Sequence, residues 1–368
     1  MSAIGGAASA AIGEWPAVSQ LQDLRDILRA GILAPSAENR HYLRFEIGTD
    51  RVRLWSTDEA TWAEQPHRRM LDLMSYGAVV RNMQLCSQRC GHVQHTEWLP
   101  DPARPALIAE CRWTASPPRE DPLALVLAER HTNRRLYRRE PVDDATLRRM
   151  REAAAIDQAE LIWLADPRAR AAALLAMRIA ESERFRRHLL HAELFRAIAF
   201  DAGWHGTTRE GLPPGSLEVE MPARGPFAAL RGWPLMRAAS WLGLHHALGL
   251  RAAWLPARMS AQIGLVVCAQ ADASLAALNA GRALESAWLA ATVAGLALQP
   301  MAAATVLVRQ RPGHGWVSAK AQQRIVQALR IAAHGRPIEH TFMLLRVGHA
   351  KPPTVVTQRH VIDDYLLG

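Results

Sequence analysis

The first periodic segment of the chain has the spacing of an amphipathic helix. Apolar residues recur three or four positions apart over 21–33, charged residues lie between them, and the segment ends at Ala34-Pro35-Ser36. Alternating apolar and polar positions follow at 43–47 and 52–55, on either side of a Gly-Thr-Asp turn. The pattern predicts a helix, a polar loop and two strands.

A second set of segments repeats this order further along the chain. A long helix at 68–91 and a strand at 106–113 complete the first set. The second set has a helix that Asp143 or Asp144 can cap, strands at 161–164 and 264–269, a long helix at 274–295, and a strand at 341–347. Helix, strand, long helix and strand are therefore expected twice.

The two predicted long helices also share the relative positions of two glycines and a leucine. Gly, Leu and Gly fall at matching offsets in Gly77, Leu85 and Gly91 and in Gly281, Leu289 and Gly295. Such repetition predicts one folding unit present twice in an α+β fold. We expect a disordered lead-in at 1–20, a first half at 21–125 and a second half at 126–368.

A stretch rich in Gly and Pro interrupts the second half at 203–234. This composition disfavours regular structure and predicts a long loop draped over the surface. We interpret this covering segment as a lid over a ligand site. The alternative is a connecting loop with no role.

An uncharged run at 286–308 is long enough to span a bilayer. Gln299-Pro300 interrupts it, and its richness in Ala and Thr favours a buried helix, a turn and a buried strand. The prediction is that the chain has no membrane segment.

Composition narrows the class of ligand. The 368 residues are 49% hydrophobic and 21% charged, which is ordinary for a globular protein, and the net charge is +9, carried mostly by Arg. Planar guanidinium groups favour phosphate or carboxylate partners. The four scattered cysteines do not suggest a disulfide framework, so a reducing cytoplasm is expected.

Each predicted half keeps one motif that the other lacks. The loop after the first helix reads Ala34-Pro-Ser-Ala-Glu-Asn39, and the segment before the helix of the second half reads Arg130-His-Thr-Asn-Arg-Arg135. Arg130, Thr132 and Arg134 stand on alternate residues, so an extended segment lets them converge on one phosphate. The alternative is a solvated basic edge.

Taken in order, these motifs resemble a known family. Pro35-Ser36-x-x-Asn39 after a helix, Arg130-His-Thr-x-Arg134 before Pro141-Val142, the paired Gly-x13-Gly helices and a C-terminal segment at 348–359 look like the FMN-dependent nitroreductase superfamily. Ordinary members build each flavin site from two identical subunits. The internal repetition is similar to the Acg-like branch, in which two such units are fused. The resemblance covers 21–367 apart from the covering segment.

The resemblance implies a nitroreductase-like fold in which two fused units form an intramolecular pseudo-dimer around FMN. By analogy, Arg130, His131, Thr132 and Arg134 of the second half, with Arg359, hold the flavin phosphate, ribityl chain or pyrimidine edge. Pro35, Ser36 and Asn39 line the same flavin from the first half. The family's N–H donor to flavin N5 lies in a turn that corresponds here to Gln299, Pro300 and Met301. Pro300 has no N–H, so a neighbour must donate.

The implied activity is hydride transfer through FMN from NADH or NADPH to a small nitro, quinone or related acceptor, with no catalytic side chain required. Trp204, Phe227 and Trp233 are the aromatic residues expected to cover the flavin. Two departures bear on substrate preference: Asn39 is followed by Arg40-His41-Tyr42-Leu43 where the family has x-Gln-Pro-Trp, and Thr357 stands where Lys is common.

Three other interpretations stay open. The first is a flavin-binding or storage protein whose covering segment excludes substrates. A zinc site is suggested by the spacing of Cys86, Cys90, His92 and His95. Nucleic-acid binding rests on Arg135, Arg138, Arg139, Arg148, Arg149 and Arg151, but no recognition-helix motif accompanies them. We expect a small-molecule partner, no nucleic acid and no membrane, with the fused chain acting as a monomer or a homodimer.

Overall fold

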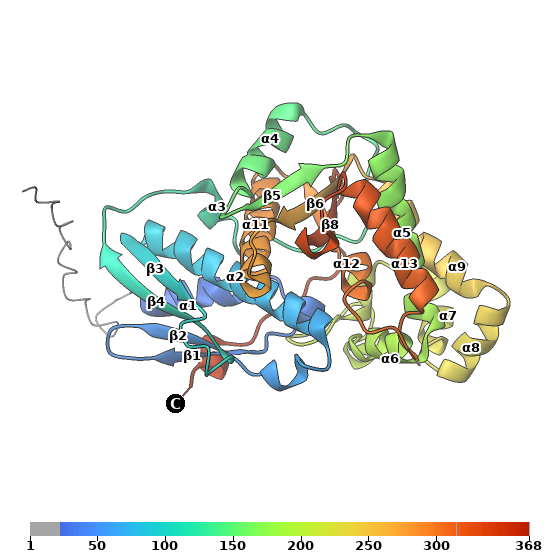
Figure 1. Cartoon of the computed structure of the whole chain (residues 1–368), viewed down its shortest axis with the longest axis horizontal. Helices are drawn as coiled ribbons and strands as arrows, with labels where there is room; N and C mark the ends of the chain where they lie inside the picture. Colours follow the sequence, from blue (N-terminus) through green and yellow to red (C-terminus); the bar gives the residue numbers. More distant parts are fainter. Residues whose placement is uncertain (1–22, 314, 368) are drawn as a thin grey trace, which may run out of the picture.

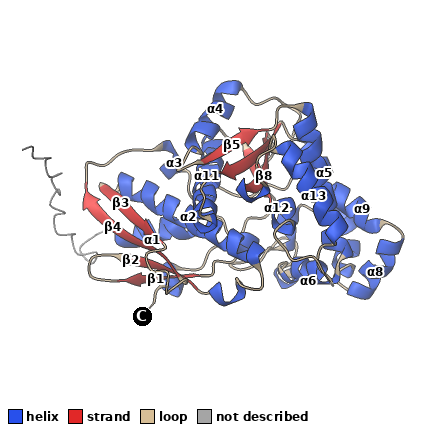
Figure 2. Ribbon diagram, in the orientation of Figure 1, coloured by secondary structure: helices blue, strands red, loops and turns tan. Residues whose placement is uncertain are grey.

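The computed structural model describes residues 23–313 and 315–367, so the predicted lead-in at 1–20 lies outside the described residues. The described chain is an α+β arrangement of two four-stranded antiparallel sheets with helices packed against them (Figures 1 and 2). The long helices α2 (Pro66–Arg89) and α11 (Ala273–Val293) cross at the centre of the molecule (Figure 1).

The first sheet follows the predicted order of elements. After α1 (Leu24–Ile32) come β1 (Leu43–Ile47), β2 (Val52–Ser56), α2, β3 (His92–Trp98) and β4 (Leu107–Ala115). The strands are ordered β1-β2-β4-β3. The predicted helices and strands exist with ends shifted by a few residues. The exception is β3, which the sequence did not predict because its residues include two His and a Glu that broke the apolar pattern.

The second sheet has the same order of strands along its width. After α4 (Asp144–Ala153) come β5 (Ala159–Trp163), β6 (Gln262–Cys268), α11, β7 (Ala297–Met301) and β8 (Thr341–Gly348), ordered β5-β6-β8-β7. The side chain of Asp143 caps α4 by accepting a hydrogen bond from the Thr146 N–H, as predicted. In both sheets the strand that follows the long helix lies at an edge.

Close backbone approach explains the paired glycines of the long helices. A Cβ atom on Gly77 would lie 2.0 Å from the carbonyl oxygen of Leu278, and one on Gly281 would lie 1.9 Å from that of Met74. Each contact joins a glycine to the residue three positions before the other glycine. Only glycine fits here, because any side chain would collide with backbone atoms that cannot move independently.

The largest departure from prediction is the stretch between β5 and β6. It holds α5 (Pro167–Arg186), α6 (His188–Arg196), α7 (Arg224–Ala229), α8 (Trp233–Trp241), α9 (Leu244–Gly249) and α10 (Leu255–Met259). Helices α6 to α9 gather at the end of the molecule furthest from the first sheet (Figure 1). The covering segment therefore contains α7 and the start of α8, and predicting it as a structureless loop was wrong. Pro226 and Pro234 stand in the first turns of α7 and α8, where the missing N–H costs little.

The uncharged run at 286–308 forms the end of α11, β7 and the short helix α12 (Ala303–Leu307). The helix α13 (Ala319–Ala332) then packs beside α5, and a short helix α3 (Pro122–Leu125) joins the halves. No helix in the described ranges combines the length and apolar content needed to cross a membrane.

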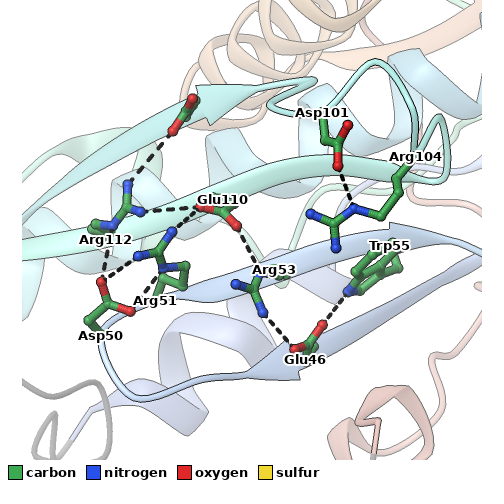
Figure 3. A network of polar contacts seen from close by, with 10 residues as sticks. Glu46, Asp50, Arg51, Arg53, Trp55, Asp101, Arg104, Glu110 and Arg112 are labelled. Atoms are coloured by element: carbon green, nitrogen blue, oxygen red, sulfur yellow. Dashed lines mark hydrogen bonds and ion pairs between the residues drawn. The ribbon is translucent and has the colours of Figure 1, made fainter.

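The outer face of the first sheet carries ion pairs instead of an apolar layer (Figure 3). Glu110 of β4 accepts hydrogen bonds from Arg51 at 2.5 Å and Arg53 at 2.7 Å, and Arg53 also reaches Glu46 of β1 at 2.7 Å. Adjacent residues of these strands, such as Phe45 and Leu54, point to the opposite face of the sheet and are buried there. This face is therefore adapted to solvent.

The end of the chain returns to the first half. Leu366 pairs in parallel with Phe45, and the Leu367 N–H donates to the Phe45 carbonyl at 2.8 Å. The C-terminal segment thereby crosses from the second sheet to the first, and it carries Arg359 to the first half.

Candidate functional site

Two adjoining pockets lie where the halves meet. The larger has a volume of about 340 Å³ and the smaller about 80 Å³. They share Pro35, Ser36, Glu38, Thr132, Arg134 and Leu212. All eleven residues predicted for the cofactor site line one or both pockets: Pro35, Ser36, Asn39, Arg130, His131, Thr132, Arg134, Gln299, Pro300, Met301 and Arg359. Segments far apart in sequence thus meet in one place.

The loop after α1 is held in an unusual conformation. Glu38 and Asn39 have positive φ angles of 57° and 59°, a region that non-glycine residues seldom occupy. Asn39 is buried, its Nδ2 donates to the carbonyl of Arg209 at 3.1 Å, and its Oδ1 accepts from Arg359. The buried Oγ of Ser36 has no hydrogen-bond partner within the described chain. A buried hydroxyl without a partner is costly, so Ser36 is available to a ligand.

The segment that carries Arg130 to Arg134 lies against β7. Thr132 forms a parallel bridge with Leu298, and the Asn133 N–H donates to the Leu298 carbonyl at 3.1 Å. The pairing with a strand supports the expected extended conformation. It gives Thr132 and Arg134 to both pockets and Arg130 and His131 to the smaller one.

The guanidinium groups of Arg134 and Arg359 have no carboxylate partner among the residues that the structure describes. Within the described chain, Arg134 donates to the Ser216 carbonyl at 3.2 Å, and Arg359 donates to the carbonyls of Ile32 at 2.9 Å and Ala34 at 2.7 Å. Neither forms an ion pair with a described residue. Burial is the main cause that lowers the pKa of each to about 10. The protein keeps two poorly solvated positive charges that an anion would stabilise.

Arg130 differs from the other two, because the protein supplies it with an anion. Its Nε lies 3.2 Å from Oε1 of the fully buried Glu285 on α11, and its Nη2 donates to the Leu33 carbonyl at 2.9 Å. The guanidinium also stacks over Trp288, 4.4 Å from the ring centroid. Burial raises the pKa of Glu285, and Arg130 opposes that shift. The predicted phosphate role of Arg130 thus competes with an internal carboxylate.

The resemblance implied that Gln299, Pro300 and Met301 form a turn, and this prediction was wrong. These residues end strand β7, which pairs with β8 through Pro300 opposite Leu345. The edge position explains how a strand tolerates a residue without an N–H. Gln299 is fixed by its Oε1, which accepts from Nε of the fully buried Arg346 at 2.8 Å.

The larger pocket has two surfaces that the sequence did not single out. One is apolar, from Leu284 and Trp288 of α11 and Met343 of β8. The other is a charged wall formed by His67, Arg68, Asp72, Glu181, Arg184 and Glu193. The sequence signal that could have indicated this wall was the presence of acidic residues, such as Asp72, among the apolar residues of a predicted helix.

Burial shifts the pKa values of Asp72 and His67 in the charged wall. Asp72 is buried, accepts a hydrogen bond from the Trp62 indole at 2.9 Å, and has its pKa raised to about 7 by burial. Burial lowers the pKa of His67 to about 4. Near neutral pH, His67 is therefore neutral and Asp72 can hold or release a proton.

The covering segment contributes part of the lining of the smaller pocket. Leu212 and Ser216 line it, and Thr207 Oγ1 donates to the Val356 carbonyl at 2.6 Å. The Gln358 N–H donates to the Thr208 carbonyl at 2.9 Å. Contacts with the C-terminal segment and with Arg134 hold it in place.

The aromatic residues expected to cover a flavin lie elsewhere. None of Trp204, Phe227 and Trp233 lines either of the two pockets in the described chain. Trp204 lies under Arg224, Phe227 packs near Phe195, and Trp233 packs near His191. Phe227 and Trp233 pack against a small helical core formed by Phe185, Phe195, Ile198, Leu230 and Met236. The prediction that the three aromatic residues cover the flavin site was wrong.

Residues of the suggested zinc site lie on different elements. Cys86 is buried on α2, and His95 of β3 contacts Thr114 Oγ1 at 3.1 Å on the neighbouring strand. Within the described residues, no group of three or more His, Cys, Asp or Glu side chains has an arrangement that could hold a metal ion.

Comparison with known proteins gives similarity to solved structures. No protein-family model and no curated protein matches the sequence. The FMN-dependent nitroreductase NfnB from Mycobacterium smegmatis, in complex with NADPH, is 16% identical, with 62% of this chain and 88% of that chain covered and a TM-score of 0.33. A likeness of this extent does not establish a family for this chain.

Proposed function

We propose that the protein is an FMN-binding oxidoreductase of the nitroreductase type, in which two fused halves form an intramolecular pseudo-dimer around one flavin. The observation that supports this most strongly is the meeting of four separate segments at adjoining pockets. The segments are 35–39, 130–134, 299–301 and Arg359, all of which the resemblance assigns to the flavin site.

The donor set of the smaller pocket fits a phosphate. Arg134 and Arg359 have no carboxylate partner among the described residues, and the Ser36 hydroxyl is buried without a partner. Charge-assisted hydrogen bonds from guanidinium groups are strong, and a hydroxyl can donate a further bond. We assign Arg134, Arg359, Ser36 and Thr132 to the phosphate and ribityl end, with Asn39 holding Arg359 in position.

The larger pocket fits the flat apolar part of the flavin. Leu284, Trp288 and Met343 offer an apolar surface, while Gln299 and Pro300 approach from β7. When bound, FMN supplies hydride transfer, and the protein's part is to orient it and to admit an acceptor. Arg134 lines both pockets, so its positive charge can stabilise an electron-rich ring system.

Repetition in the fold supports the fusion of two units. The two sheets have equivalent strand orders, and the reciprocal contacts of Gly77 and Gly281 relate the long helices to each other. The second half then contributes Arg130 to Arg134, and the first half contributes Pro35 to Asn39. In this account one chain makes one complete site and acts as a monomer or a homodimer.

The charged wall suggests where an acceptor binds. We propose that NADH or NADPH donates the hydride and that a small nitro, quinone or related compound accepts it beside Arg68 and Asp72. A carboxyl with a pKa of about 7 can give a proton to the reduced acceptor. All four cysteines are free thiols, which suits the proposed cytoplasmic location.

A storage protein that keeps flavin under a cover is the second candidate. The hydrogen bonds of the covering segment to the C-terminal segment favour it, because they oppose opening. Anaerobic mixing with NADPH or NADH separates the two functions. Rapid loss of oxidised-flavin absorbance, followed by its return on adding a quinone, supports the oxidoreductase, whereas flavin that stays oxidised with both nucleotides supports storage.

A further inference from the structure

Helix α8 presents an apolar surface to solvent at the far end of the molecule. Met236, on its inner side, is fully buried against the small helical core. Leu235 is 50% exposed, Trp241 82% and Leu242 91%. These residues, together with the exposed Pro234, Arg237 and Ala238, form what we call the α8 surface. An outward helix face is normally polar, so this one requires another explanation.

The turn after α8 follows directly on the exposed apolar side chains at the end of this helix. Gly243 follows Leu242 with a φ of 83°, a conformation suited to glycine, and the chain reverses into α9. Figure 1 shows the α8–α9 hairpin at the extremity of the molecule opposite the first sheet. Trp241 and Leu242 therefore project where a flat partner can reach them.

The stretch of chain that carries this surface is basic. The stretch 221–271 contains no Asp or Glu but holds five arginines, at 224, 231, 237, 251 and 258. Arg231 and Arg237 are exposed and form no ion pair with a described residue. An acid-free stretch of this length is unusual in a chain that has 35 acidic residues.

We propose that the α8 surface docks the protein onto anionic phospholipid membranes. Trp is favoured at the boundary between headgroups and acyl chains, and neighbouring cations gain energy from anionic lipid. A second copy of this chain fits less well, because two such surfaces would bring arginines together without a carboxylate to neutralise them. The inference does not depend on the identity of the cofactor.

Flotation of the purified full chain with lipid vesicles tests the proposal. We expect binding to vesicles of phosphatidylcholine with phosphatidylglycerol and little binding to phosphatidylcholine alone. The double substitution W241S/L242S should weaken partition onto the anionic vesicles at least about tenfold. R231Q/R237Q should do the same and make binding less sensitive to salt.

A matched control is L125S, which removes a 62% exposed leucine from another surface and should leave binding unchanged. Thermal unfolding checks that each variant is folded. The proposal is overturned if the native chain does not float with anionic vesicles, if it binds neutral vesicles equally well, or if W241S/L242S binds as before. A concentration-dependent dimer that W241S/L242S abolishes, without vesicle binding, would instead assign the surface to a second copy.

Discussion

Arg359 donates a hydrogen bond from Nη1 to Oδ1 of Asn39, although 320 residues separate them in sequence. The same guanidinium donates to the carbonyls of Ile32 and Ala34, so it fixes the end of α1 and the loop that follows. Arg359 thus ties the C-terminal segment to the first half. Asn39 has a positive φ, and this long-range hydrogen bond helps to hold its side chain in place.

Arg134→Gln should weaken FMN binding by roughly ten- to a hundredfold, because a charge-assisted hydrogen bond is worth about 1.5–3 kcal/mol. Titration calorimetry of flavin-free protein with FMN measures the effect. Arg135→Gln is the matched control, since its guanidinium bonds to Pro352 and Thr354 and does not line either pocket. Equal affinity of the Arg134 variant and the native chain would remove Arg134 from the cofactor site.

Gly77→Ala should destabilise the fold by about 3 kcal/mol, because the new Cβ would collide with the Leu278 carbonyl oxygen. Gly281→Ala should cost a similar amount, because its contact with Met74 is the reciprocal one. Urea denaturation gives both values. Gly225→Ala, with no atom within 4 Å of the new Cβ, should change stability little. A difference of several kcal/mol between the two helix variants would argue against equivalent positions.

Asp72→Asn should change how stability varies with pH. The folded pKa of about 7 lies above the reference value of 3.8, so the native carboxyl stabilises the fold fully below pH 3.8 and loses that contribution as pH rises through 7. About three pKa units correspond to about 4 kcal/mol as an upper value. Denaturation between pH 4 and 8 should show the native chain losing stability relative to the variant.

The exposed Asp26→Asn serves as the reference for this experiment, since Asp26 lies on the solvent side of α1. It should show no such divergence from the native chain. A constant difference between the Asp72 variant and the native chain across this range would mean that Asp72 ionises normally.

The local sequence pattern was sufficient to predict those helices and strands whose tertiary packing favours the same structure. The strand at 43–47 and the capped helix after Asp143 were predicted from alternation and capping alone. Residues 299–301 were misjudged because only the position of β7 at the sheet edge makes a proline acceptable there. The covering segment was misjudged because packing of Phe227 and Trp233 into a small core stabilises short helices that Gly and Pro disfavour.

The candidate site likewise contains residues that the sequence indicated and residues that it could not indicate. Motif order indicated the residues that line the pockets, because these carry recognisable spacing. Glu285 could not be assigned to Arg130 from the sequence, since the ion pair requires α11 to lie beside the segment before α4. The charged wall was likewise hidden, because Asp72 and Glu193 come from elements 121 positions apart and meet only in the folded chain.

The central claim is that two halves of one chain enclose a single FMN. The most direct measurement is the visible spectrum of freshly purified protein, with the released cofactor identified and counted per chain after heating. The account predicts flavin absorbance and one FMN per chain. Protein that is colourless and does not take up added FMN, or that holds two flavins per chain, would contradict it.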